Sequence, residues 1–296
     1  MKRILSLFLM FLMILSIFTS CSKKDSDNSN ESTDSLVSSE DMFIYDILDD
    51  TIIKGLTKKG MKEKILVVPE NCVSFCLLEP SKNLEKISFA NPNTVLEDFA
   101  LQKCSSLKEV VLPENLSVIS QSLCYQCSNL EEIYIPKNVT IIEKDSFFEC
   151  KSLKQVKMGD KVEVIEDYAF AWCLNLESIN FSTSLKEIQQ NAFIQNEKLK
   201  KVEFSEGLET IENSAFHQCH SIESVKLPEG LKSLESLAFH YCDSLKEIYL
   251  PASLETIVMA SFGQRANMID VYVKKDSAAD ILFEDYNDGS MNKKYY

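Results

Sequence analysis

The sequence predicts a repeat solenoid, a fold in which one short structural unit is stacked many times along an axis. Three observations predict it. A 23-residue period runs through most of the chain without a slip, the same positions of each unit are apolar, and the units at both ends are irregular. One unit of this length cannot cover its own apolar side, so units must stack and the terminal ones must differ.

The period is marked by a residue that returns every 23 positions, which we number position 1 of the unit. It is filled by Cys104, Cys127, Cys150, Cys173, Cys219 and Cys242, with Asn196 once. Apolar residues recur at positions 4, 7, 9 and 16, and position 21 is Phe from Phe147 to Phe262, with Cys124 in the first unit. These five apolar columns predict one continuous core.

The pattern C-x-x-L-x-x-I-x-L-P-x-x-L-x-x-I-x-x-x-A-F-x-x resembles the treponemal, BspA-like class of leucine-rich repeat, over about residues 60 to 273. The resemblance implies an α/β-type solenoid. Positions 4 to 9 would form short parallel strands on a concave face, and the part with the phenylalanine would return along an irregular or short-helical convex side. It also implies a cell-surface protein of a host-associated bacterium, of a family with members implicated in adhesion to host matrix proteins.

The organisation of the chain follows from where the pattern is regular. We expect a lipoprotein signal peptide at 1–20, a flexible tether at 21–40, an N-terminal cap with a truncated repeat at 41–80, one degenerate and seven regular repeats at 81–264, and a partial repeat with a C-terminal cap at 265–296. Within the caps, the pattern predicts a strand pair at Met42 to Leu56 and a short helix at Ser277 to Phe283.

The N-terminus has the features of an export signal. A basic start precedes an apolar stretch at residues 4–18, and the small residues Thr19 and Ser20 precede Cys21. The run F-T-S-C resembles the lipobox of bacterial lipoproteins, which implies that Cys21 carries lipid. The alternatives are an ordinary signal peptide or a transmembrane anchor, although the stretch is short for a span. We expect an exported, membrane-anchored lipoprotein at the cell surface or outer membrane.

The charge of the chain excludes one class of partner. Loss of Lys2 and Arg3 with the signal peptide would leave 29 basic and 45 acidic residues, a charge of −16, with Arg265 as the last arginine. Such a chain lacks the cationic surface that a phosphate backbone requires. Seven glycines also offer little for a phosphate-binding loop. We expect no nucleic-acid partner, no cofactor and a monomer.

Strand geometry predicts which side chains face the solvent. If positions 4, 7 and 9 point inward, positions 5, 6 and 8 point outward. We expect position 8 to form a binding column on the concave face: Val111, Tyr134, Lys157, Asn180, Glu203, Lys226 and Tyr249. Tyr134 and Tyr249 are the candidate anchors, because exposed aromatic residues are enriched in binding hot spots. The alternative is that Lys and Glu only solubilise the sheet and that Tyr suits strands.

The cysteines have two interpretations. An exported chain with nine cysteines after Cys21 could hold a disulfide framework, but a thiol that recurs once per unit in a buried position is expected to pack as a small apolar residue. Cys124 and Cys127 match C-x-x-C, yet they fall in two different packing columns, which disfavours a redox or zinc site. The state of Cys72 and Cys76 stays open.

The histidines are the remaining candidates for chemistry. His217 and His240 share position 22 and should stack about 5 Å apart, with His220 close by. A metal site is conceivable, but the same column also holds Tyr, Phe, Ala and Ile, so structural histidines are favoured. A calcium loop at 285–289 is rejected, because its glycine comes one place early and no Glu follows at the twelfth place.

We recognise no catalytic motif in the sequence, since it shows no nucleophile with its base and no H-E-x-x-H helix. The sequence therefore predicts no enzyme and no metal. It predicts a lipid-anchored protein that binds other proteins, with adhesion to host or neighbouring-cell proteins as the first hypothesis. A periplasmic or envelope scaffold that binds other envelope components is the second. An enzyme that uses the three histidines is the third.

Overall fold

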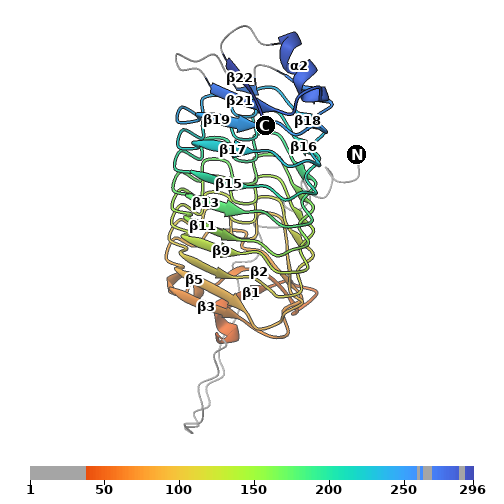
Figure 1. The fold of residues 1–296 in the computed structure, drawn as a ribbon. Helices are drawn as coiled ribbons and strands as arrows, with labels where there is room; N and C mark the ends of the chain where they lie inside the picture. The colour runs from red at the N-terminus through yellow and green to blue at the C-terminus, as the bar shows by residue number, and fades with distance from the viewer. Residues whose placement is uncertain (1–37, 259–260, 263–268, 287–290) are drawn as a thin grey trace, which may run out of the picture. The chain divides into compact units, whose positions relative to one another are not determined.

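The computed structural model describes residues 38–258, 261–262, 269–286 and 291–296. The signal peptide, Cys21, most of the tether, Arg265 and residues 287–289 of the rejected calcium loop lie outside the described residues. Residues from the first repeat onward form a parallel β-solenoid of about 10 turns with little helix (Figure 1). Among the described residues, no helix has the length and apolar composition that crossing a membrane requires.

Each turn places one short strand on one side of the solenoid, which we call the first face (Figure 1). Seven of these strands form a parallel sheet: β3 (Ile65–Val68), β5 (Lys86–Phe89), β7 (Glu109–Val111), β9 (Glu132–Tyr134), β11 (Gln155–Lys157), β13 (Ser178–Asn180) and β15 (Lys201–Glu203). A separate four-stranded sheet follows: β17 (Ser224–Lys226), β19 (Glu247–Tyr249), β21 (Ile269–Val273) and β22 (Met291–Tyr295). In the regular strands position 7 is buried between two outward positions, as strand alternation predicts.

A second parallel sheet lies at positions 15 and 16 of the turns, on what we call the second face. It contains β8 (Val118–Ile119), β10 (Ile141–Ile142), β12 (Val164–Ile165), β14 (Glu187–Ile188), β16 (Thr210–Ile211), β18 (Ser233–Leu234) and β20 (Thr256–Ile257). The short-helical part of the expected convex side is therefore not supported, whereas the segment with the phenylalanine is irregular, as expected. Position 16 is a β-branched or leucine column, and such residues pack well on a pleated surface.

The part of the turn that carries the phenylalanine forms a third ladder, and its hydrogen bonds explain the absence of helix. The N–H groups of Ser122, Cys124 and Gln126 donate to carbonyls of the next turn at 2.9, 2.7 and 2.7 Å. Two residues of each turn, at positions 19 and 23, take a left-handed conformation, with φ of 54° at Ser122 and 58° at Gln126. Because these N–H groups bond to the neighbouring turn, they are not free for the i→i−4 bonds of an α-helix.

The core consists of columns that run through the stack. Successive position-21 rings from Phe147 to Phe239 stack at centroid distances of 5.1 to 5.4 Å and are fully buried. Stacked aromatic pairs add about 0.5–1.5 kcal/mol each beyond the area they bury. The register of one turn on the next is thus fixed by identical side chains as well as by backbone bonds.

Irregular elements close both ends of the stack. At the N-terminal end, η1 (Glu40–Met42) and η2 (Gly60–Lys62) flank an antiparallel pair, β1 (Phe43–Tyr45) and β2 (Ile52–Leu56). β2 pairs with β4 (Ser74–Phe75), which pairs with β6 (Val95–Leu96). At the other end, α2 (Ala278–Tyr286) precedes β22, and Lys293 Nζ lies 2.9 Å from Asp280 Oδ1.

Candidate functional site

The position-8 column lies on the first face, where the sequence places it. Val111 and Tyr134 are 47% and 58% exposed, and the same column continues through four exposed polar residues: Lys157, Asn180, Glu203 and Lys226. Tyr249 differs, because it is half-buried. Its ring stacks on Tyr272 at 4.4 Å and meets the ring of Tyr296 edge-on at 5.9 Å. Of the two proposed anchors, Tyr134 is therefore the more accessible.

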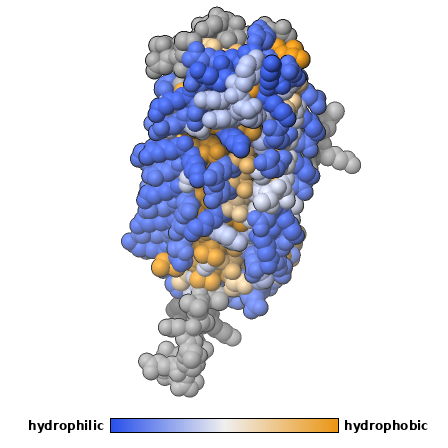
Figure 2. Space-filling model, viewed as in Figure 1, coloured by the Kyte–Doolittle hydropathy of each residue, from blue (hydrophilic) through white to orange (hydrophobic). Residues whose placement is uncertain are grey.

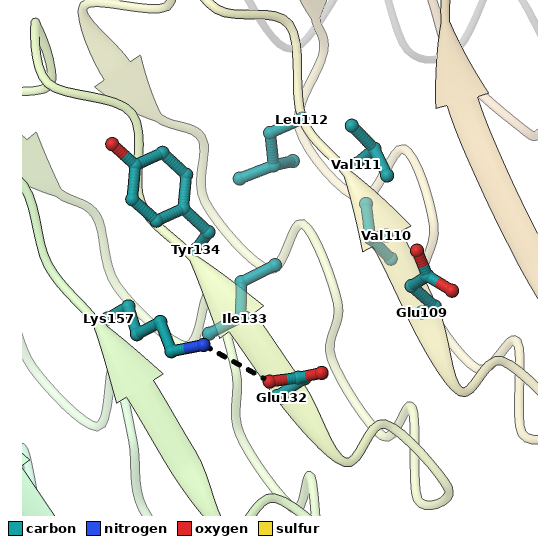
Figure 3. A pocket seen from close by; sticks show the side chains of 8 residues that line it. All are labelled: Glu109, Val110, Val111, Leu112, Glu132, Ile133, Tyr134 and Lys157. Atoms are coloured by element: carbon teal, nitrogen blue, oxygen red, sulfur yellow. Dashed lines mark ion pairs between the residues drawn. The ribbon is translucent and has the colours of Figure 1, made fainter.

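A hollow of about 230 Å³ lies on the first face between β7 and β9 (Figure 3). It forms where two neighbouring strands lose part of their pairing. β9 and β11 pair as far as Tyr134 and Lys157, whereas β7 and β9 pair only through Val110 and Ile133. Figure 3 shows the side chains of Leu112, Val111 and Tyr134 around the opened end. The hollow thus brings together three members of the predicted column: Val111, Tyr134 and Lys157.

Charged side chains frame this apolar centre. Lys157 Nζ lies 3.6 Å from Glu132 Oε2, and Lys86 Nζ lies 2.7 Å from Glu109 Oε1. All four side chains are more than 40% exposed, so each pair contributes little to stability. Figure 2 shows apolar surface emerging between polar flanks along the stack. An apolar centre within a polar rim is the usual anatomy of a protein interface.

A column of alternating charge, which the 23-residue pattern alone does not reveal, runs beside this site at position 5. The glutamate Glu85 sits between two lysines, each with Nζ 2.7 Å from one of its oxygens. These two ammonium groups lower the pKa of Glu85 to about 2, mainly through hydrogen bonds. The column alternates in sign at every turn: Lys64, Glu85, Lys108, Glu131, Lys154, Glu177, Lys200, Glu223 and Lys246. The alternation is seen only when the residues at position 5 are compared from one turn to the next.

The alternation has a physical reason. Like charges directly opposite on neighbouring strands are destabilising, whereas opposite charges attract. Identical turns would place identical charges about 4.8 Å apart. Further pairs close across the same column, between Lys154 and Glu131 at 2.7 Å and between Lys246 and Glu223 at 3.0 Å. Seven of these nine residues are therefore in ion pairs within the chain, so the charge at position 5 is largely compensated internally.

The histidines form a stacked pair and a separate contact with a carboxylate. The rings of His217 and His240 are parallel at 5.3 Å, as their shared position predicts, and Tyr241 packs against both. Burial lowers the pKa of His217, which favours its neutral form. His220 is not drawn into this stack, because its Nδ1 lies 2.6 Å from Asp243 Oδ2. Within the described part of the chain, no three His, Cys, Asp or Glu side chains are grouped as metal ligands.

The described cysteines are buried, and those from Cys72 to Cys219 are free thiols. Their thiols have a role beyond filling space. The thiol of Cys150 donates to the carbonyl of Cys124 at 3.2 Å, and Cys219 donates to Phe193 in the same way. Asn196 replaces the thiol with an amide that donates to the carbonyls of Phe170 and Phe193, both at 3.0 Å. Position 1 is therefore a hydrogen-bond donor slot, which accounts for an Asn in a buried column.

Burial makes these thiols poor nucleophiles. It raises the pKa of Cys104 to about 12 and that of Cys72 to about 11, so the reactive thiolate is scarce at neutral pH. Cys76, also free, has its pKa raised for the same reason. Cys124 and Cys127 lie in separate packing columns as free thiols.

Comparisons with known proteins identify the family of the repeat. The model of the BspA type leucine rich repeat region matches residues 71–200 and 163–281, in six copies. Among solved structures, a leucine-rich repeat protein from Bacteroides ovatus is 19% identical, with 83% of this chain and 87% of that one covered and a TM-score of 0.44.

Two further structures are similar. A leucine rich cell surface protein from Faecalibacterium prausnitzii is 18% identical over 90% of this chain and 96% of that one, with a TM-score of 0.37. The leucine rich repeat protein of T. pallidum is 18% identical over 82% and 78%, with a TM-score of 0.33. No curated protein sequence matches. The family model covers most of the repeat region, and the chain belongs to the BspA-type leucine-rich repeat family.

Proposed function

We propose that this chain is a lipid-anchored protein of the bacterial cell surface that binds other proteins through its first face. Proteins built from leucine-rich repeats commonly mediate protein–protein interaction. The observation that carries the proposal is the hollow between β7 and β9, where Val111 and Tyr134 are exposed within a rim of ion pairs. Tyr134 is the proposed anchor, and the other members of the position-8 column extend the contact.

The area of the first face suits this role. Strands lie about 4.8 Å apart, so the seven regular turns present a surface roughly 35 Å long. That is enough for a standard interface of about 800 Å² per partner. The variable residues at position 8 would carry the specificity, because most residues of the position-5 column are already paired within the chain.

Photo-crosslinking in the producing bacterium tests the proposed face. A photoreactive phenylalanine analogue replaces Tyr134 in one strain. In a matched strain it replaces Val95, which is 55% exposed on β6, at the same positions of the turn as the second-face strands. We expect a discrete partner to crosslink at position 134 and not at position 95. Equal crosslinking of the same protein at both positions would contradict the assignment of the face.

The partner's origin separates the two biological roles. Recovery of host or neighbouring-cell proteins, together with loss of the chain when intact cells are treated with protease, supports adhesion. Recovery of envelope components alone, from a chain that protease cannot reach, supports the envelope scaffold instead. The anchor is tested separately, because Cys21→Ser should abolish labelling by a radioactive fatty acid and release the chain from the membrane fraction.

A further inference from the structure

The first face is interrupted at a second place, between β15 and β17. β13 and β15 share three residue pairs, and so do β17 and β19. Among the described residues no strand pairing joins β15 to β17, and the sheet of the first face divides there. The second face is continuous at the same level, since β16 pairs with β18 and Phe216 stacks on Phe239 at 5.2 Å. The solenoid is therefore opened on one face only.

Aromatic rings line the hollow of about 180 Å³ that lies beside this interruption. Phe204 is half-buried. It stacks on Phe181 at 5.5 Å on one side, whereas position 9 of the next turn is the smaller Leu227. On the far side stand Tyr249 and Tyr296, and the hydroxyl of Tyr296 donates to the carbonyl of Leu250 at 3.0 Å, which fixes that ring. Three aromatic side chains from different turns thus converge on one space.

Two carboxylates and one ammonium group accompany these rings. Glu206 and Glu229 occupy position 11 of neighbouring turns, and one oxygen of each accepts a backbone N–H from the following turn, at 3.3 and 3.1 Å. No lysine in the described part of the chain lies within ion-pair distance of either. The contrast within the same column is clear, because Glu114 is paired with Lys137 at 3.4 Å. Lys226 also lines the hollow, so the local charge is one negative unit.

The geometry points to a cationic side chain, an arginine or lysine from a basic segment of a partner protein, as the occupant of this hollow. Aromatic rings attract a cation through their faces, and the carboxylates add direct charge attraction. Like charges on neighbouring turns repel each other, and a bound cation would relieve that repulsion. The net charge of −14 attracts the same class of partner over a longer range. This inference rests on the proposed function, because it names the chemistry of a protein bound at the first face.

Lys226 allows a test in which two substitutions should change the binding affinity in opposite directions. If the occupant is a cation, the ammonium group of Lys226 repels it while Glu229 attracts it. Lys226→Gln should therefore tighten binding and Glu229→Gln should weaken it, each about three- to tenfold. Glu114→Gln is the matched control, since it removes the same charge at the same position of the turn but far from the hollow. An effect of overall charge would make the Glu229→Gln and Glu114→Gln variants equal.

The experiment measures binding of a short peptide to the full-length chain by saturation-transfer NMR. The probe is a nine-residue Gly/Ser peptide with one central arginine, and its control carries citrulline, which keeps the shape and loses the charge. We expect the arginine peptide to bind about tenfold more tightly. Tyr249→Ala should abolish the difference and Tyr249→Phe should preserve it. Equal affinity for the two peptides, or equal effects of the two glutamate substitutions, overturns the proposal.

Sedimentation of the same samples identifies the other possible occupant. A dimer that Tyr249→Ala dissociates would mean that a second copy of this chain fills the hollow, and it would overturn the assignment to a foreign basic segment. Failure of this inference can be distinguished from failure of the proposed function. Crosslinking at position 134 with no arginine selectivity removes only this inference, whereas arginine selectivity without any crosslinked partner removes the proposed function.

Discussion

The buried position 21 keeps almost the same residue from turn to turn along the stack, whereas the residue at the exposed position 8 changes at every turn. Position 21 is Phe in six consecutive turns, and its rings stack at 5.1 to 5.4 Å from Phe147 to Phe239. At position 8, from Val111 to Tyr249, no two neighbouring turns carry the same residue. Repetition inside fills one continuous core, whereas repetition outside would stack like charges. The difference teaches that the interior columns specify the fold and leave position 8 free to specify a partner.

Truncation of one ring in each column gives the largest contrast in stability. Phe193→Ala removes a fully buried ring from between two stacked neighbours, and it should lower the free energy of unfolding by about 3–5 kcal/mol. Tyr134→Ala removes a ring that is 58% exposed and should change it by about 0.5 kcal/mol or less. Urea unfolding of both variants measures the difference. Comparable losses would mean that position 8 is structural as well.

Position 1 tests whether an interior column needs a donor and not only an apolar group. Asn196→Ala leaves the carbonyls of Phe170 and Phe193 without the amide that serves them and should cost about 1–3 kcal/mol. Asn196→Cys restores the thiol of the other turns and also removes the amide oxygen, which is buried without a hydrogen-bond partner. We therefore expect the cysteine variant to be at least as stable as the parent chain. If the alanine variant were as stable as the cysteine variant, the slot would be a packing position alone.

Two glutamates at different positions of the turn should respond to pH in opposite directions. The pKa of Glu85 is lowered to about 2 by Lys108 and Lys64, so its contribution to stability is present above about pH 4.5 and lost as the pH falls toward 2. The pKa of Glu212 is raised to about 7 by burial and by Glu187 and Glu235, so the folded chain takes up a proton there first. Stability at Glu212 is therefore gained as the pH falls through 7 toward 4.5.

Melting temperatures of two glutamine variants measure this difference. At pH 8, Glu85→Gln should melt below the parent chain and Glu212→Gln above it, since the glutamine oxygen still accepts the N–H of Gln190 that Glu212 accepts at 3.0 Å. The Glu212→Gln difference should vanish by about pH 4.5, and the Glu85→Gln difference should shrink only below that pH. A Glu212→Gln variant less stable than the parent at pH 8 would refute the like-charge description.

The columns that point inward could be predicted from the sequence, and the bonds between turns could not. The 23-residue period and strand alternation are enough to predict that Leu107 is buried and that Tyr134 is exposed, as the structure shows. The second sheet and the third ladder depend on where backbone N–H groups bond, which a side-chain pattern does not report. The left-handed residues, such as Ser122, are not glycines, so composition gives no sign of them. For this reason the described turns do not form the short helices that were expected on the convex side.

The candidate site was predictable in its residues but not in its shape. The sequence predicts one continuous column at position 8, with Tyr134 and Tyr249 as equivalent anchors. The structure instead opens the strands beside Tyr134 and covers Tyr249 with Tyr296. That second contact joins residues 47 positions apart and involves the irregular C-terminal cap, where the repeat pattern has ended. The alternating charges at position 5 were present in the sequence, and reading each column across turns would have found them.

The measurement that most directly tests the division between interior and first face is the affinity of the crosslinked partner for the parent chain and for Tyr134→Ala, by isothermal titration calorimetry. We expect the substitution to weaken binding by about tenfold or more, the cost of losing an aromatic hot spot, while the melting temperature stays unchanged. Unchanged affinity in a folded Tyr134→Ala variant would contradict the assignment of binding to this face.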